Sequence, residues 1–354
     1  MSDKGNRLRE LRQLHGMTQK DFAAALGTTQ PHLSAVERGR KPAGTLAGKA
    51  EWVFHTGPGF FAEGPAQYGS EALNYRTWKT PAGVQDAANI TFAELEREAR
   101  EQLRDLPVLN LTDWDLTDRT NPLPLADIER IVTRVRGMLR IGPTGPVPNV
   151  TRALEFAGVP VVELFNPFVD LSRIDGVSSP DTSTDRGVVA VTPNQAGDRV
   201  RFTRAHELGH LVLHTGVRPG SAHLREEEAN LFAGAFLMPE EDARELLSPS
   251  LKLEGYAQVK AKYAVSIGAL VRRAKELGII DYARYRTLNT QLSSRGWRKQ
   301  EPVAVPVERT SLIAEMRIAA LQDSSGTNTG SRESSPASGG TANTDGAVIS
   351  LFRK

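Results

Sequence analysis

The chain has 354 residues, of which 39% are hydrophobic and 24% charged, with a formal net charge of +2; this composition is typical of a soluble globular protein with two or three domains. It contains no cysteine, which excludes disulfides, thiolate metal ligands and a cysteine nucleophile. No segment approaches the roughly 20 apolar residues of a membrane span and the N-terminus lacks an apolar leader, so we expect a cytoplasmic protein without a membrane partner.

Residues 1–61 predict a small helical domain. Helical spacing of leucine over residues 6–15, an N-cap at Thr18 and another at Thr28 or Thr29 indicate three short helices, each followed by a glycine. We expect a fourth helix to close the core around Trp52 and Phe54. The domain carries nine lysines and arginines against five acidic residues, an excess that favours a nucleic-acid partner.

Two short helices joined by a tight turn are typical of a helix-turn-helix, although a small bundle with only protein contacts has the same pattern. The segment GTTQPHLSAVERGRKP, residues 27–42, closely resembles the recognition segment of phage-repressor (XRE/Cro-type) domains. That resemblance implies binding to double-stranded DNA. It also implies two sets of DNA contacts. The residues at the groove of the DNA or at its edges would be Gln19, Thr29, Gln30, His32 and Ala35, and those at the phosphates would be Arg38, Arg40 and Lys41. Ala35 offers only a methyl group, so the base preference stays open.

Residues 62–122 follow a stretch rich in glycine and proline and are interpreted as a helical connector. Within it, the charged segment 91–105 predicts a solvated surface helix. Residues 301–354 form a C-terminal extension, and its Ser/Gly/Thr-rich part, residues 322–350, is predicted to be disordered.

A second domain is predicted over residues 123–300. Its helical segments far outnumber its two β-branched runs, at 159–165 and 187–192, which are predicted strands. The expected fold class is therefore mainly α with a small β-sheet (α+β), preceded by an all-α helix-turn-helix domain.

The helix predicted over residues 199–214 contains the H-E-x-x-H pattern. His206 and His210 are four residues apart, so they project from one helix face and can bind a single ion. Glu207 lies beside them, where it can accept a proton from a water molecule on the metal. Two ordinary histidines on a helix are the alternative interpretation.

A catalytic zinc usually has three protein ligands and one open position. His214 continues the spacing, but eight residues of helix rise about 12 Å, too far for a third bond of about 2 Å. The three glutamates that begin the next predicted helix, 225–238, are the better source. Helical phase places Glu226 nearest the inward face, with Glu228 second and Glu227 nearly opposite. Asn230, one turn after Glu226, is expected to orient a zinc-bound histidine.

FTRAHELGHLVLH followed by EEEANLFAGAFLMP looks like the ImmA/IrrE family of zinc metallopeptidases. The segments YAVSIGALVRRAKELGIID and SSRGWRKQEP resemble its C-terminal half, so the resemblance extends over residues 123–300. It implies a gluzincin-like domain, with His206, His210 and Glu226 as Zn²⁺ ligands and Glu207 as the general base. Many such proteins carry an XRE-type domain in front.

Together these features lead to two hypotheses. The first is a DNA-binding transcriptional regulator whose zinc endopeptidase domain cleaves a specific regulatory protein such as a repressor. The second is a regulator or antitoxin-like protein whose peptidase-like domain is a non-proteolytic sensor or dimerisation module. The expected partners are double-stranded DNA and a repressor-like or toxin-like protein, and a homodimer is left open.

Overall fold

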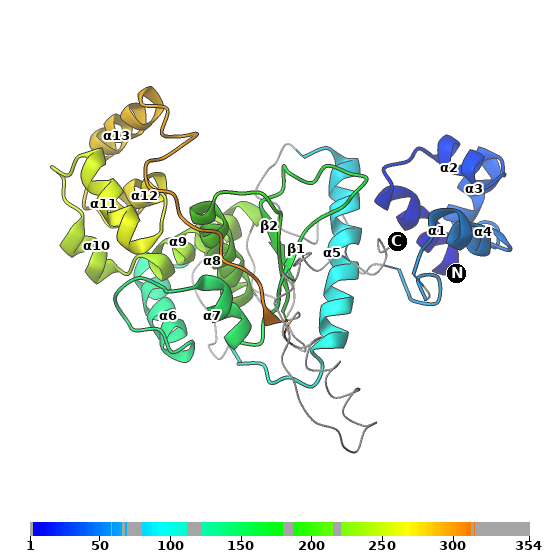
Figure 1. Cartoon of the computed structure of the whole chain (residues 1–354), viewed down its shortest axis with the longest axis horizontal. Helices are drawn as coiled ribbons and strands as arrows, with labels where there is room; N and C mark the ends of the chain where they lie inside the picture. Colours follow the sequence, from blue (N-terminus) through cyan, green and yellow to red (C-terminus); the bar gives the residue numbers. More distant parts are fainter. Residues whose placement is uncertain are drawn as a thin grey trace, which may run out of the picture.

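The computed structural model describes residues 3–57, 59–65, 68, 80–111, 122–179, 187–214, 221–312 and 315. Figure 1 shows an N-terminal helical unit, then a small sheet between helices, then a group of C-terminal helices. The predicted fold class is confirmed: the described part is mainly helical with one mixed three-stranded sheet. The prediction of disorder for residues 322–350 lies outside the described residues.

The N-terminal unit has the four expected helices, with α1 at Asp3–Leu14, α2 at Gln19–Ala25, α3 at Gln30–Glu37 and α4 at Leu46–Phe54; α1 begins three residues earlier than expected. Thr18 accepts a hydrogen bond from the backbone N–H of Asp21, and Thr29 accepts one from that of His32. Thr29 is therefore the N-cap that the sequence left open. Gly27, between α2 and α3, has a φ of +62°, which residues with a side chain rarely adopt.

The prediction that Trp52 closes this core is wrong, because its side chain is 80% exposed. The buried stripe of α4 is formed by Leu46, Ala47 and Ala50, and Trp52 lies on the opposite face, two residues after Ala50. Phe54 packs as expected, with its ring stacked 4.8 Å from that of Phe22.

Helix α5, Ala82–Gln102, begins nine residues earlier than predicted and is not a solvated surface helix. Figure 1 shows it between the N-terminal unit and the sheet. Its Ile90 packs in the N-terminal core, while Phe92 and Leu95 pack against the sheet. The sequence pattern misled because several of its charged residues are buried and paired with groups from other elements.

The N-terminal unit is docked on α5 through polar contacts. Arg7 is completely buried; its Nη1 donates to Glu10 Oε2 at 2.5 Å and to Glu94 Oε1 at 2.8 Å, and its Nε donates to the carbonyl of Phe60 at 2.9 Å. Burial raises the pKa of Glu94, and the charge of Arg7 opposes that rise. Gln13 adds a 2.8 Å hydrogen bond to Asp86 at the start of α5.

The sheet is formed by β1 (Val161–Glu163), β3 (Val189–Val191) and β2 (Gly176–Ser178), in that spatial order. β1 runs parallel to β3 and β2 runs antiparallel to it. Side chains alternate between the faces: Val162 and Ala190 pack with α5, whereas Val161, Val189 and Val191 pack in the large core on the α8 side.

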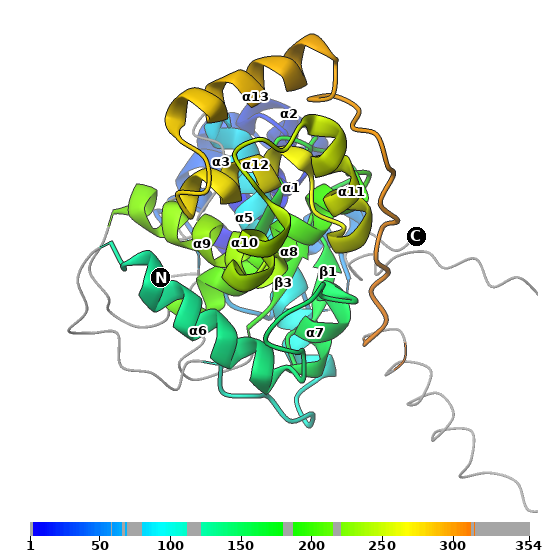
Figure 2. The same ribbon diagram turned by 90° about the vertical axis from the view of Figure 1, so that its left-hand side faces the viewer.

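The remaining helices are α6 (Leu125–Met138), α7 (Val150–Phe156), α8 (Gly197–Leu213), α9 (Ala222–Leu237), α10 (Glu240–Leu246), α11 (Leu253–Tyr263), α12 (Ile267–Glu276) and α13 (Tyr282–Ser294). Figure 2 shows residues 300–312 running along one side of them, from α13 to α7. There Glu308 accepts hydrogen bonds from Val150 N and Thr151 N and pairs with Arg201 of α8. Within the described ranges, no helix combines the length and apolar character that crossing a membrane requires.

Helices α8 and α9 cross at very close range, and Gly209 makes this possible. A Cβ at that position would lie 3.1 Å from Phe232 Cβ and 3.2 Å from Ala229 Cα. The apolar face of α9, predicted to point inward, includes both of these buried residues. This close crossing brings the N-terminal turn of α9 over the two histidines of α8.

Candidate metal centre and nucleic-acid face

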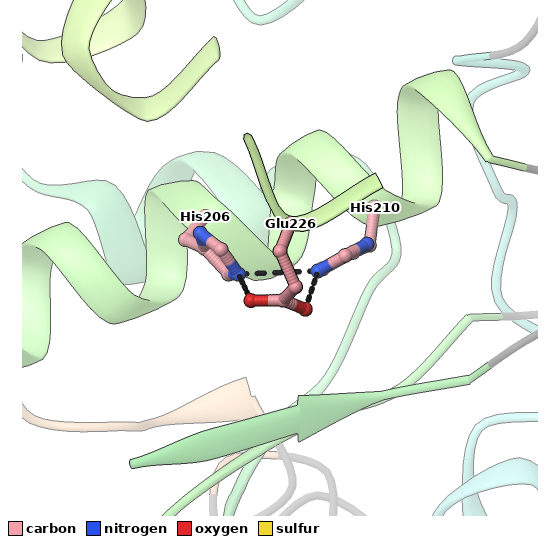
Figure 3. A group of neighbouring side chains, drawn as sticks. All are labelled: His206, His210 and Glu226. Carbon is pink, nitrogen blue, oxygen red and sulfur yellow. Dashed lines mark hydrogen bonds and ion pairs between the residues drawn. The ribbon is translucent and has the colours of Figure 1, made fainter. Parts of the chain in front are cut away.

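Helix α8 presents His206 and His210 on one face, as their spacing predicts, and both side chains are buried. Their Nε2 atoms lie 3.1 Å apart. Glu226, from the first turns of α9, faces both, with Oε1 3.1 Å from His210 Nε2 and Oε2 3.4 Å from His206 Nε2. Figure 3 shows the three side chains converging on one point. The geometry thus brings together the three residues that the sequence nominated.

These three residues fit a metal ion. One donor atom from each lies within 4.8 Å of the others, and all three residues are buried. Two imidazoles and a carboxylate are a donor set used by catalytic zinc sites, which keep a fourth position open. Burial works to raise the pKa of Glu226, but hydrogen bonds from His206 and His210 and their charges outweigh it and hold the pKa well below the usual range. The carboxylate is therefore ionised, as a metal ligand must be.

Glu207 is buried beside this centre and is held from the sheet. The hydroxyl of Ser178, at the end of β2, donates to Glu207 Oε2 at 2.7 Å. Burial raises the pKa of Glu207, and the charges of His210 and His206 oppose that rise. At Gly176 a Cβ would lie 2.5 Å from Thr203 Cγ2, so β2 passes very close to α8. The residue pattern does not indicate Ser178, because residues 176–178 are not predicted as a strand.

A second group of side chains lies behind His210. His210 Nδ1 is 2.9 Å from His214 Nδ1, and His214 Nε2 is 3.0 Å from Glu228 Oε2. The other oxygen of Glu228 accepts a 2.7 Å hydrogen bond from the backbone N–H of Leu123. His214 therefore lies outside the group formed by His206, His210 and Glu226, in agreement with the prediction from helical rise. Glu228, the second choice for the third ligand, contacts His214 and not this group.

The other predicted residues of this helix, Glu227 and Asn230, do not contact His206 or His210 through any hydrogen bond or ion pair found among the described residues. Glu227 is exposed and lies 3.6 Å from the exposed His223, as its phase on the helix predicts. Asn230 Nδ2 donates to the backbone carbonyl of Glu226 at 2.7 Å. Its orienting role toward a histidine stays a prediction.

The N-terminal unit presents the residues that resemblance assigned to DNA on and around α3. Thr29, Gln30, Arg38, Arg40 and Lys41 are exposed, and Gln19, His32 and Ala35 are partly exposed. Gln30 Nε2 donates to Gln19 Oε1 at 3.0 Å, and Gln19 Nε2 donates to Glu37 Oε2 at 2.8 Å. Arg12 also binds Glu37, through Nε at 2.8 Å and Nη2 at 3.1 Å. A shallow hollow lies here, lined by Arg9, Arg12, Gln19, Glu37 and Arg38.

Comparison with protein families matches two parts of the chain. Residues 8–56 match the helix-turn-helix model, and residues 166–275 match the model described as the IrrE N-terminal-like domain, peptidase family M78. The chain therefore carries an XRE-type helix-turn-helix domain and an IrrE N-terminal-like domain. No match was found among curated proteins.

The IrrE N-terminal-like match contains the whole candidate centre. It spans β2 with Ser178, α8 with the two histidines and Glu207, and α9 with Glu226. This is a metallopeptidase-type domain with a buried His-His-Glu cluster that could hold a metal ion. The helix-turn-helix match spans all four N-terminal helices except the first residues of α1, and such a domain implies binding to DNA.

Proposed function

We propose that this protein is a DNA-binding transcriptional regulator whose zinc-dependent endopeptidase domain cleaves a specific regulatory protein, such as a repressor. The observation that carries the proposal is Glu207. It is buried next to His206, His210 and Glu226 and is held by Ser178. A site that only bound metal would need the three ligands but not an adjacent, positioned carboxylate.

The chemistry follows from these side chains. His206, His210 and Glu226 would hold the ion, and a bound zinc would supply a Lewis acid that polarises a scissile carbonyl and lowers the pKa of water. Glu207 would accept the proton of the attacking water and then donate it to the leaving amine. Burial favours this exchange because it brings the pKa of Glu207 upward from its usual value.

Restricted access supports a selective rather than a digestive enzyme. His206, Glu207 and His210 are each no more than 5% exposed, so a peptide reaches them only through a fitted approach. The helix-turn-helix domain of the same chain implies that the protein works at DNA. A regulatory protein acting at the same DNA is therefore the substrate class that we propose.

The Glu207→Gln variant tests the proposal. The wild-type chain and the variant would each be incubated with purified repressor-like proteins encoded by neighbouring genes, and cleavage and zinc content would be measured. We expect the variant to keep its zinc and lose cleavage by roughly 100- to 10,000-fold, which is the range for the loss of a general base. If the variant keeps its zinc and its regulatory effect in cells is unchanged, the domain is a non-proteolytic sensor and the peptidase proposal fails.

A further inference from the structure

Behind the candidate metal centre, three buried groups form a chain that ends at the backbone. It runs from His210 Nδ1 to His214 Nδ1 at 2.9 Å, from His214 Nε2 to Glu228 Oε2 at 3.0 Å, and from Glu228 Oε1 to the N–H of Leu123 at 2.7 Å. The side chains of His210, His214 and Glu228 are each less than 5% exposed. We propose that Glu228 and His214 are positioning residues that fix the tautomer and ring orientation of His210, so that its Nε2 offers a lone pair to the metal. This inference rests on the metal site of the proposed function.

Hydrogen-bond roles can be assigned from the Glu228 end. The N–H of Leu123 is always a donor, and an ionised carboxylate only accepts, so Glu228 accepts at both oxygens. His214 Nε2 must then carry a hydrogen. A metal-bound His210 must donate from Nδ1, which requires a neutral His214; its ring then carries only that one hydrogen, and His214 Nδ1 is an acceptor. His210 Nδ1 therefore donates to it, and His210 Nε2 is left with its lone pair.

The same roles follow from the metal end. A histidine that binds a metal through Nε2 carries its hydrogen on Nδ1 and donates it to a neighbouring acceptor. That acceptor is His214 Nδ1, and the hydrogen of His214 then lies on Nε2, facing Glu228. The metal at one end of this hydrogen-bonded series and Glu228 at the other therefore require the same tautomers of His210 and His214.

The other histidine of the centre differs. His206 Nδ1 is buried and has no hydrogen-bond partner among the described residues. The orientation of His206 thus comes from packing, whereas that of His210 comes from an oriented polar chain. Through Leu123 this chain also links the metal centre to the segment that leads into α6, which packs on α9.

A glutamine at position 228 would disturb the chain with almost no change in shape. Its single carbonyl oxygen can serve either Leu123 N–H or His214 Nε2–H, but not both. If the oxygen stays with Leu123, the amide donates to His214 Nε2, His214 Nδ1 then carries the hydrogen, and it donates to His210 Nδ1. His210 would then carry its hydrogen on Nε2, the atom that must bind the metal.

The experiment measures zinc affinity of the full-length chain by competition with a chromophoric chelator, and the ¹⁵N shifts of the histidine rings in the zinc-free protein. Glu228→Gln should weaken zinc binding by about 10- to 100-fold and convert His210 to the Nε2–H form. Glu227→Gln, one residue away and exposed, is the matched control and should leave both readouts unchanged. Equal zinc affinity in the two variants would overturn the inference.

A pair of variants at position 214 keeps the test decisive if Glu228→Gln does not fold. His214→Gln can still accept a hydrogen bond from His210 and donate one to Glu228, so this variant should retain most of the zinc affinity. His214→Leu can do neither, so its zinc affinity should fall by about 10- to 100-fold. Identical affinities for this pair would also overturn the inference. A wild-type chain that binds no zinc would instead refute the proposed function, so the two failures are distinguishable.

Discussion

The two helix pairs that carry the proposed functions, α2 with α3 and α8 with α9, present their side chains in opposite ways. On α3 and directly after it, Gln30, Arg38 and Arg40 are exposed, and the fold depends on caps, glycines and the leucines beneath. On the metal-binding pair, His206, His210 and Glu226 are themselves part of the buried interface. Substitutions of exposed residues in the first pair should therefore change DNA affinity without changing the free energy of unfolding. Substitutions in the second pair should change both zinc affinity and the free energy of unfolding.

Arg7 tests whether buried polar contacts also stabilise the N-terminal unit, as they do the α8–α9 interface. Arg7→Met would remove the cation that contacts both buried Glu10 and Glu94, while Arg97 would stay on Glu94 at 3.0 Å, so the free energy of unfolding should fall by about 3 kcal/mol, the lower end for breaking a buried ion pair. Chemical denaturation of the full chain measures this. Lys4→Met, at an exposed position of α1, is the control. Equal stability of the two variants would show that α1 does not depend on α5.

Glu226 tests the buried pair directly. Glu226→Ala removes one of three proposed ligands, and since zinc binding energies of about 10–16 kcal/mol are shared by a few ligands, affinity should fall by roughly 100-fold or more. Chelator competition gives the value, with Glu227→Ala as the control on the same turn of helix. An unchanged zinc affinity would show that Glu226 is not the third ligand.

Gly209 tests whether the close crossing of α8 and α9 builds the site. A methyl group there would press on Phe232 and Ala229, so Gly209→Ala should cost about 1–3 kcal/mol of stability and also weaken zinc binding. At Gly234, on the same helix pair, the nearest contact of a Cβ would be an ordinary 3.5 Å, so Gly234→Ala serves as the control. Thermal denaturation with and without zinc separates the two effects.

Substitutions on the exposed pair should leave stability unchanged. Gln30→Ala should relax sequence preference by about 1–3 kcal/mol, because a side-chain contact to a base edge is lost. Arg40→Ala should instead weaken binding to all sequences and lower the slope of affinity against salt by about 1, as expected for one phosphate contact. Binding assays at several salt concentrations measure both. Unchanged binding in the two variants would exclude α3 as the recognition helix.

The parts of this molecule that were predictable from sequence depend on local rules. The N-cap at Thr18 follows from local pattern, and helical phase alone nominated Glu226, which the structure places against both histidines. The α5 helix was misjudged because its charges are paired with distant partners, such as Arg7, 87 positions away from Glu94. Chain spacing carries no signal for such pairs.

The same limit explains what was missed around the centre. Helical phase ranks Glu228 second to Glu226 as a ligand because it lies about 100° from the inward-facing Ala229. Only the fold shows that His214 and Leu123 contact its carboxylate. Ser178 comes from a strand of three residues, too short to show an alternating pattern. Trp52 was placed inside because it is large and apolar, yet its helical phase points it outward.

Zinc content combined with X-ray absorption of the purified chain tests whether His206, His210 and Glu226 bind a zinc ion. We expect one zinc ion per chain, bound by two imidazole nitrogens at about 2.0–2.1 Å and by oxygen ligands that include Glu226. A chain that takes up no zinc when titrated with it, or a zinc with a third imidazole in place of the carboxylate, would contradict this metal centre.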